Sequence, residues 1–240
     1  MLSIETKNLT KKFKEKTAVN GIELKINEGE LFALLGTNGA GKTTTIKMLS
    51  TLILPTSGEI KINGLDIIKD RQKIREILNV SPQETAIAPN LSVKENLEFM
   101  AGVYQIPNKE EKINELVKMF KLEEVLKQKA KTLSGGWQRK VSIAIALINE
   151  PKILFLDEPT LGLDVIARKE LWKIIENLKG KITILLTTHY MEEVESLSDK
   201  IGIMAKGNLV DVGTAEELIK KAGTKNFEDA FVKIATGGEL

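Results

Sequence analysis

The apolar residues of this chain follow two patterns, and each predicts a different kind of β-strand. In residues 4–9 and 22–26, apolar and polar residues alternate, as in strands with one buried face. Asn63-Gly64, within residues 59–67, has the composition of a tight hairpin turn. These segments predict a small antiparallel layer in the first part of the chain.

Residues 31–35, 153–156 and 182–186 are instead continuous apolar runs, each followed by a polar loop and a helical pattern. Such runs are typical of strands that are buried on both faces. They predict a second, mainly parallel sheet built from segments that lie far apart in the chain.

A helix-rich stretch separates the first of these runs from the other two. Ser92 and Glu95 have the spacing of a capping box before an apolar-periodic segment. A second helix is indicated by apolar residues at helical spacing, namely Ile113, Leu116, Val117 and Phe120. We therefore expect an inserted helical subdomain at residues 85–150.

Helical and turn patterns also occupy the last third of the chain. An apolar stripe over residues 171–178 predicts a helix that stops at Gly180. Residues 206–208, with the sequence Lys-Gly-Asn, predict a hairpin turn. Thr214 and Glu217 then form a second capping pattern, which predicts a helix behind the hairpin.

Composition narrows the possible classes of function. Hydrophobic residues make up 42% and charged residues 28% of the 240 residues, which is typical of a globular protein. Lys plus Arg number 35 and Asp plus Glu 33, and these charges are interspersed, so nothing favours nucleic-acid binding. Without cysteine and with one histidine, the chain lacks the usual zinc ligands, and we expect any metal to be held by oxygen atoms.

No apolar run approaches the roughly 20 residues that a membrane helix needs. The first ten residues also lack the basic start and apolar centre of a signal peptide. We therefore expect a cytoplasmic protein.

Residues 36–43, GTNGAGKT, match the pattern GxxxxGK[ST] between an apolar strand and the helical run 44–49. Glycines let successive backbone N–H groups point at phosphate oxygens, to which the positive end of the next helix adds. Lys42 supplies a charge for the β and γ phosphates, and the Thr43 hydroxyl is a ligand for Mg²⁺. A flexible glycine loop is the alternative, against which the flanking strand and helix argue. The residues expected to contact the nucleotide are Asn38, Gly39, Ala40, Gly41, Lys42, Thr43 and Thr44.

These patterns together predict an α/β fold. It has a P-loop NTPase core with a mainly parallel sheet, an N-terminal antiparallel β layer and an inserted helical subdomain. We place the boundaries at residues 1–84 for the β layer and first half of the core, 85–150 for the helical subdomain, and 151–240 for the rest.

The apolar run 153–156 ends in Asp157-Glu158, so its strand delivers two carboxylates to the sheet edge that also carries the phosphate loop. We expect Asp157 to hold Mg²⁺. Glu158 is then placed to orient or deprotonate the attacking water, which is the acid–base task of ATP hydrolysis. A solvated acidic loop end is the alternative interpretation of this pair.

Residues 133–136, LSGG, precede the helical run 137–148 and form a second helix start with free N–H groups. With this motif the sequence resembles the ATPase subunits of ATP-binding cassette (ABC) transporters, over essentially the whole chain. In that family two subunits pair head to tail. The resemblance implies that Ser134, Gly135 and Gly136 close over ATP bound at Lys42 of a second copy. An ordinary helix N-cap is the alternative role of Ser134.

The resemblance also implies roles for four further residues. Phe13 lies where the family stacks an aromatic ring on adenine, and Gln83 matches the glutamine that reaches Mg²⁺ and links the site to the membrane partner. Asp164 matches the loop that touches the opposite subunit, and His189 matches the switch histidine that contacts the γ-phosphate. The alternatives, in the same order, are a core phenylalanine, a surface glutamine, a helix cap and a structural histidine.

One departure from the family pattern bears on the predicted dimer. Trp137 follows LSGG where glutamine, methionine or glutamate is commoner, so a bulky indole is expected at the dimer seam. Residues 187–195 and 226–237 resemble those of exporter ATPases that work with separately encoded permeases. An amphipathic helix is the alternative account of the second segment.

The resemblance thus implies an ATP-hydrolysing motor subunit that powers a separate membrane permease, in the export direction, from the cytoplasmic face of the membrane. Its cofactors would be ATP and Mg²⁺, and its partners a second copy or a homologous subunit and the permease. Two alternatives stay open. One is a soluble ABC-type ATPase acting on ribosomes or nucleic acid, and the other is a nucleotide-gated interaction module with little turnover.

Overall fold

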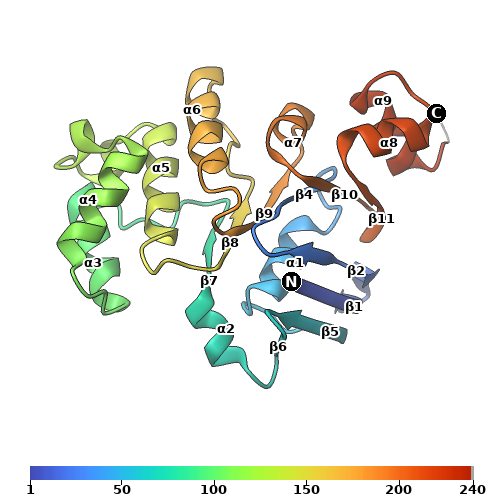
Figure 1. The fold of residues 1–240 in the computed structure, drawn as a ribbon, viewed down its shortest axis with the longest axis horizontal. Helices are drawn as coiled ribbons and strands as arrows, with labels where there is room; N and C mark the ends of the chain where they lie inside the picture. The colour runs from blue at the N-terminus through green and yellow to red at the C-terminus, as the bar shows by residue number, and fades with distance from the viewer. Residues whose placement is uncertain (239–240) are drawn as a thin grey trace.

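A computed structural model describes residues 1–238, and its centre is a six-stranded sheet with the order β11-β10-β4-β9-β8-β7 (Figure 1). All neighbouring strands are parallel except β10 and β11, which confirms the mainly parallel sheet and the hairpin turn at residues 206–208. The strands are β4 (Leu31–Leu35), β7 (Leu78–Ser81), β8 (Ile153–Asp157), β9 (Thr183–Thr188), β10 (Lys200–Ala205) and β11 (Asn208–Gly213).

The three apolar runs are buried on both faces because the sheet separates two hydrophobic cores. In β4, Leu31, Ala33 and Leu35 pack into one core, whereas Phe32 and Leu34 pack into the other. The first core continues into the helical region, and the second lies between the sheet and the N-terminal layer. Alternating side chains therefore enter different cores, which explains why these runs lack polar residues.

The second sheet is antiparallel, as predicted, with the order β2-β1-β5-β6 and with β3 paired to β1. The predicted strand at 22–26 is wrong in one respect, because it is divided between the end of β2 and β3. The hydroxyl of Thr6 donates to the Ile22 carbonyl and accepts from Leu24 N–H, and so replaces regular pairing there. The strands are β1 (Leu2–Phe13), β2 (Lys16–Ile22), β3 (Lys25–Asn27), β5 (Ser57–Ile62) and β6 (Leu65–Asp66).

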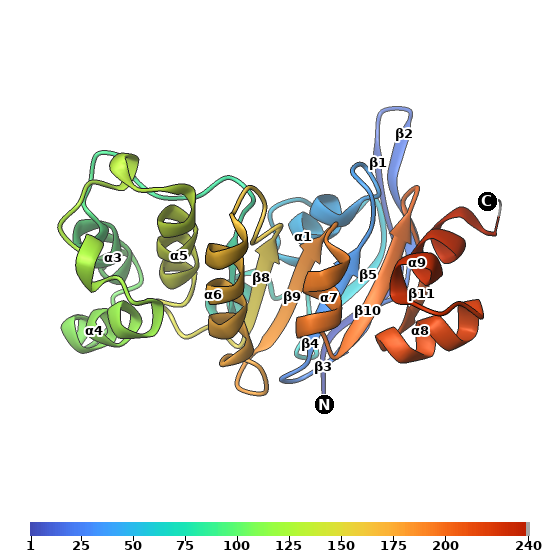
Figure 2. The same ribbon diagram turned by 90° about the horizontal axis from the view of Figure 1, so that it is seen from above.

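Between β7 and β8 the chain is helical, and Figures 1 and 2 show α3, α4 and α5 gathered at one end of the molecule. The Ser92–Glu95 capping box of α3 is present, and the four apolar residues predicted for α4 are buried. The domain boundaries at 85 and 150 stay a prediction. The helices of this region are α3 (Val93–Val103), α4 (Lys109–Phe120), η1 (Glu123–Val125), η2 (Ala130–Thr132) and α5 (Gly135–Ala146).

In the described part of the chain six further helices cover the core, and the capping box of α8 at Thr214 and Glu217 is present as predicted. The helix predicted to stop at Gly180 instead ends at Glu176. Residues 178 and 179 donate to carbonyls only three residues back, so the last turn is a tight turn and not α-helix. The helices are α1 (Lys42–Leu49), α2 (Arg71–Ile77), α6 (Val165–Glu176), α7 (Met191–Leu197), α8 (Ala215–Ala222) and α9 (Phe227–Thr236).

Candidate active site

Four adjacent parallel strands bring most of the predicted site residues to one edge of the sheet. In β4 and β9, Leu35 pairs with Thr188, so the phosphate loop and His189 leave the sheet at the same level. In β8 and β9, Asp157 pairs with Thr187, which places the two carboxylates beside them. The fourth strand, β7, ends two residues before Gln83 at the same edge.

The loop at residues 36–43 wraps around the amino group of Lys42. Its Nζ donates to the carbonyls of Gly36, at 2.7 Å, and Thr37, at 3.3 Å. Gly41 has φ +106°, and a Cβ there would lie 2.5 Å from the Ala18 carbonyl oxygen, so only glycine fits. The loop thus passes directly into α1, whose first residue is Lys42.

Glu158 joins the phosphate loop to His189. Its Oε1 lies 3.2 Å from Lys42 Nζ, and its Oε2 lies 2.6 Å from His189 Nδ1. Both Lys42 and Glu158 are buried, so their charges attract each other strongly. Glu158 has φ +50°, a strained backbone for a residue with a side chain, and its N–H donates to Thr187. This sharp turn at the end of β8 directs the carboxylate toward Lys42.

Asp157, one residue earlier, is held by two hydroxyl groups. Thr43 and Thr187 donate to its Oδ1, at 3.1 and 2.6 Å. The carboxylate is buried, and these charge-assisted bonds compensate for its lost hydration. Asp157 and Thr43, both predicted as Mg²⁺ ligands, are therefore in direct contact.

A cavity of about 380 Å³ collects these groups in one place. The predicted residues Gln83, Glu158 and His189 line it together with the phosphate loop. Its complete lining is Lys16, Ala18, Asn38, Gly39, Ala40, Gly41, Lys42, Thr43, Thr44, Gln83, Glu158, Leu161 and His189. The arrangement presents N–H groups and an ammonium on one side and a carboxylate–imidazole pair on the other, which suits a phosphate ester and an attacking water.

Six predicted residues lie outside the wall of this cavity, and one of them, Asp157, adjoins it through its contact with Thr43. Phe13 is 48% exposed at the end of β1, with Lys11 Nζ 5.1 Å from its ring centroid, so a core phenylalanine is excluded. Ser134 precedes α5, but its exposed side chain makes no capping hydrogen bond. Gly135 and Gly136 follow it in the first turn of α5. Asp164 does cap a helix, since its carboxylate accepts from Ile166 and Ala167 N–H at the start of α6.

Trp137 is half-buried, and its indole packs against the core that continues into the helical region. The ammonium of Lys140 lies 4.5 Å from its ring centroid, in a cation–π contact. Part of the indole is therefore held within its own chain, and its place at a dimer seam stays a prediction.

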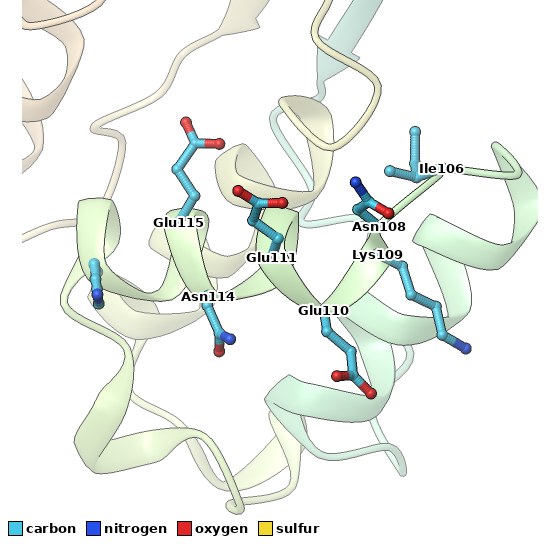
Figure 3. A pocket seen from close by; sticks show the side chains of 8 residues that line it. Ile106, Asn108, Lys109, Glu110, Glu111, Asn114 and Glu115 are labelled. Carbon is cyan, nitrogen blue, oxygen red and sulfur yellow. The ribbon is translucent and has the colours of Figure 1, made fainter.

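A larger hollow of about 1140 Å³ lies along α4, remote from the phosphate loop. Figure 3 shows the side chains around it, among them Glu110, Glu111, Asn114 and Glu115, pointing to different sides of the helix. They do not converge on a common point, as the groups of a binding site do. We therefore assign the chemistry to the smaller cavity.

Three polar residues near the site were not predicted from the sequence. Thr187 contacts both Asp157 and Glu158, and its place directly before Thr188-His189 was an available signal. Arg139 is buried, and burial lowers its pKa while the charges of Asp157 and Glu193 oppose this shift. Glu193, on α7, is fully buried, which raises its pKa. The last two lie within helices, where polar residues usually face solvent, so no pattern marked them.

Comparisons with known proteins agree with this geometry. Residues 19–161 match the ABC transporter family. The chain is 37% identical to the linearmycin resistance ATP-binding protein LnrL of Bacillus subtilis, over 98% of this chain and 75% of that protein. It is 42% identical to human phospholipid-transporting ATPase ABCA3 over 92% of this chain, but it spans only 13% of that protein.

A solved structure similar to this one is an ATP-binding cassette in a dimeric post-hydrolysis state, bound to ADP and Pi. It superposes with a TM-score of 0.80 and 28% sequence identity, covering 88% of this chain and 98% of that chain. No helix within residues 1–238 is both long enough and apolar enough to cross a membrane. On its sequence, its fold and its phosphate-loop cavity, this chain belongs to the ABC transporter family and is an ATP-binding cassette ATPase.

Proposed function

We propose that this chain is the ATP-hydrolysing motor subunit of a transporter and powers a separate membrane permease. The observation that carries the proposal is the contact of Glu158 with both Lys42 and His189 in the wall of the phosphate-loop cavity. The name of LnrL, a resistance protein, favours transport in the export direction. The chain would then act at the cytoplasmic face of the membrane.

Nucleotide binding would begin at the phosphate loop. Its N–H groups and the start of α1 attract the phosphates, and Lys42 exchanges its contact with Glu158 for the β and γ phosphates. Phe13, in the same hairpin as the cavity residues Lys16 and Ala18, would stack on the adenine.

The donor set of the site fits Mg²⁺, which prefers oxygen ligands. Thr43 and Asp157 present a hydroxyl and a carboxylate 3.1 Å apart, and Thr43 and Gln83 line the same cavity. When bound, Mg²⁺ neutralises charge on the β and γ phosphates.

Glu158 would act on the attacking water. Once Lys42 contacts phosphate, the carboxylate keeps His189 as its remaining partner and can accept the proton of the water. The imidazole holds the carboxylate in place and contacts the γ-phosphate from its other side. The strained backbone of Glu158 favours this role, since such strain persists where the surroundings fix one geometry.

A second copy would complete the site. The Ser134 hydroxyl, not used in a cap, and the first N–H groups of α5 are free to contact the triphosphate of the partner. Two-fold pairing would place Asp164 at the same seam and bury two nucleotides. Binding of ATP closes this dimer, hydrolysis opens it, and the surface around Gln83 transmits the change to the permease.

The Glu158→Gln variant tests the proposal. It should retain ATP binding, because the amide is nearly isosteric, and lose turnover by at least about a hundredfold, because it cannot accept the proton. Dimers should accumulate with ATP. Steady-state phosphate release and light scattering measure the two effects.

Lys42→Ala is the matched control, since it removes the other member of the same ion pair. It should weaken nucleotide binding itself, which a fluorescent ATP analogue can measure. Wild-type turnover by Glu158→Gln contradicts the role of Glu158, and wild-type affinity in Lys42→Ala contradicts the phosphate site.

A further inference from the structure

Arg139 holds the loop of Gln83 from the side of α5. Its Nη1 donates to the carbonyl of Pro82 at 2.6 Å, and its Nη2 donates to the carbonyl of Gln83 at 2.5 Å. The planar guanidinium thus spans two consecutive carbonyls with two parallel donors, a geometry that only arginine supplies. Gln83 itself is exposed and lies in the cavity wall, so its backbone is fixed while its side chain stays free to contact a ligand.

Because Arg139 is buried, losing its hydrogen bonds to the carbonyls of Pro82 and Gln83 would raise the free energy of the protein. Arg139 is 4% exposed, and within residues 1–238 it has no carboxylate at ion-pairing distance. A buried cation must satisfy its donors within the protein, and the two carbonyls do this here. A shift of the Gln83 loop away from α5 would leave these donors unpaired, so the loop and the helix are expected to move together.

The same helix carries the predicted contact with the partner copy. Arg139 lies three residues after Gly136, which is about 4.5 Å along the axis of α5. Lys140, the next residue, forms an ion pair of 2.7 Å with Glu170 of α6, the helix that Asp164 caps. One rigid helix therefore connects the partner-facing motif, the loop of Gln83 and the helix behind Asp164.

We propose that Arg139 is a positioning residue that makes Gln83 respond to the nucleotide of the partner copy. When Ser134 and Gly136 contact the partner's triphosphate, α5 is held in one position, and Arg139 transfers that position to the backbone of Gln83. Gln83 then reaches the metal and water in its own cavity only when the opposite site is also closed. This proposal rests on the proposed function, because it requires a dimer that shares two nucleotides.

Arg139→Met and Arg139→Lys test this role. Lysine keeps the charge but offers one ammonium in place of the two parallel donors of the guanidinium, so it should retain only part of the contact with the two carbonyls. We expect kcat to fall by about ten- to a hundredfold for methionine, as for a misplaced catalytic group, and less for lysine. ATP affinity, measured in the Glu158→Gln background, should stay within about twofold, and the cooperativity of hydrolysis with ATP should be lost.

Arg71→Met is the matched control. Arg71 also donates to a backbone carbonyl, that of Thr51 at 2.6 Å, and within residues 1–238 no hydrogen bond or ion pair joins it to α5 or to Gln83. Its kcat and cooperativity should match those of the wild type. If Arg139→Met is too unstable to purify, Arg139→Lys carries the test.

A double-mutant cycle with Gln83→Ala decides whether Arg139 acts through Gln83. The double variant Arg139→Lys, Gln83→Ala should be no slower than Gln83→Ala alone, because Gln83→Ala already removes the side chain that Arg139 positions. Additive losses, or a kcat of Arg139→Met equal to that of the wild type, overturn the proposal. Failure of the proposed function is distinguishable, because it would leave the wild type itself without ATP-dependent dimers or turnover.

Discussion

Glu158 is the residue at which the three parts of the candidate site meet. Its carboxylate contacts Lys42 of the phosphate loop and His189 after β9, and its N–H is held by Thr187. While Lys42 occupies Oε1, this carboxylate has one acceptor position fewer for a water molecule. The arrival of a triphosphate, which attracts Lys42 away, would therefore release the base at the moment when its substrate is present.

The buried Glu193 should make the stability of the protein depend on pH. Its Oε1 accepts from Trp172 Nε1 at 3.1 Å. Burial raises its pKa above 4.5, the hydrogen bond from Trp172 offsets part of this rise, and the charge of Glu158 adds to it. The protonated carboxyl thus stabilises the native state below about pH 4.5, and this contribution is lost as the pH rises through the folded value.

Glu193→Gln keeps an acceptor for Trp172 but cannot ionise. Its free energy of unfolding should exceed that of the wild type in neutral and alkaline buffer, and the difference should shrink as the pH falls. Urea unfolding between about pH 5 and pH 8 measures this. Glu192→Gln, at the exposed neighbouring position, should show no such trend. A difference that is constant with pH would contradict the assignment.

Residues at strand ends could be predicted from the sequence, and buried polar residues within helices could not. Lys42, Glu158 and His189 each follow an apolar run, and parallel strands bring such positions together. Arg139 lies between Gln138 and Lys140 in α5, and such a polar run is usually on the solvated face of a helix. Its burial depends on the carbonyls of the Gln83 loop, which is far away in sequence.

At the scale of elements, the start of α6 combines a structural and a predicted functional role in Asp164. Its carboxylate caps the helix, and the next two residues, Val165 and Ile166, are 56% and 74% exposed. Exposed apolar residues beside a polar cap fit a surface that a second copy covers. The capping alternative is thus an observed fact, and the contact with a partner is a separate question.

Substitutions of Asp164 separate these roles. Asp164→Ala should lower the free energy of unfolding by about 1 kcal/mol, because two N–H groups lose their acceptor. Asp164→Asn should keep the cap and hence the stability, since asparagine is an equally good N-cap. If Asp164 also contacts the partner, Asp164→Asn should weaken ATP-dependent dimer formation, which light scattering measures. Wild-type dimerisation of Asp164→Asn would leave capping as its only role.

Most elements were predicted because their patterns follow from local geometry, and the errors arose where distant contacts decide. The division between β2 and β3 depends on the hydroxyl of Thr6, which interrupts pairing across the sheet. The helix α6 ends before Gly180, and the N–H of Gly180 donates to the carbonyl of Gly29. Neither partner is visible in a local pattern of apolar residues.

At the scale of the whole molecule, the two halves of the predicted composite site lie on different parts of one chain. Lys42 lies in the cavity at the edge of the central sheet, whereas Ser134 precedes α5 outside the wall of that cavity. Figures 1 and 2 show α5 and α1 separated by the strands and by α6. A second copy in two-fold pairing would bring each half to its complement.

Mixing two inactive variants tests this arrangement in the assembled protein. Lys42→Ala removes the ammonium that would bind the phosphates. Ser134→Glu places a carboxylate where the partner's γ-phosphate would bind, and it removes no helix cap because the Ser134 side chain makes no capping hydrogen bond. Each variant alone should lack turnover, since every site in its dimers is defective. A mixed dimer, however, holds one site with an intact Lys42 from one copy and an intact Ser134 from the other.

Random pairing of equal amounts makes half of the dimers mixed, each with one intact site of two, so about a quarter of wild-type turnover should appear if that site works independently. If both sites must close together, as the role proposed for Arg139 requires, the recovered turnover should be far smaller, while one ATP per mixed dimer is still held. Measuring phosphate release and retained ATP in the same mixtures separates these outcomes. Folded variants that show neither effect on mixing would mean that a single copy completes its own site.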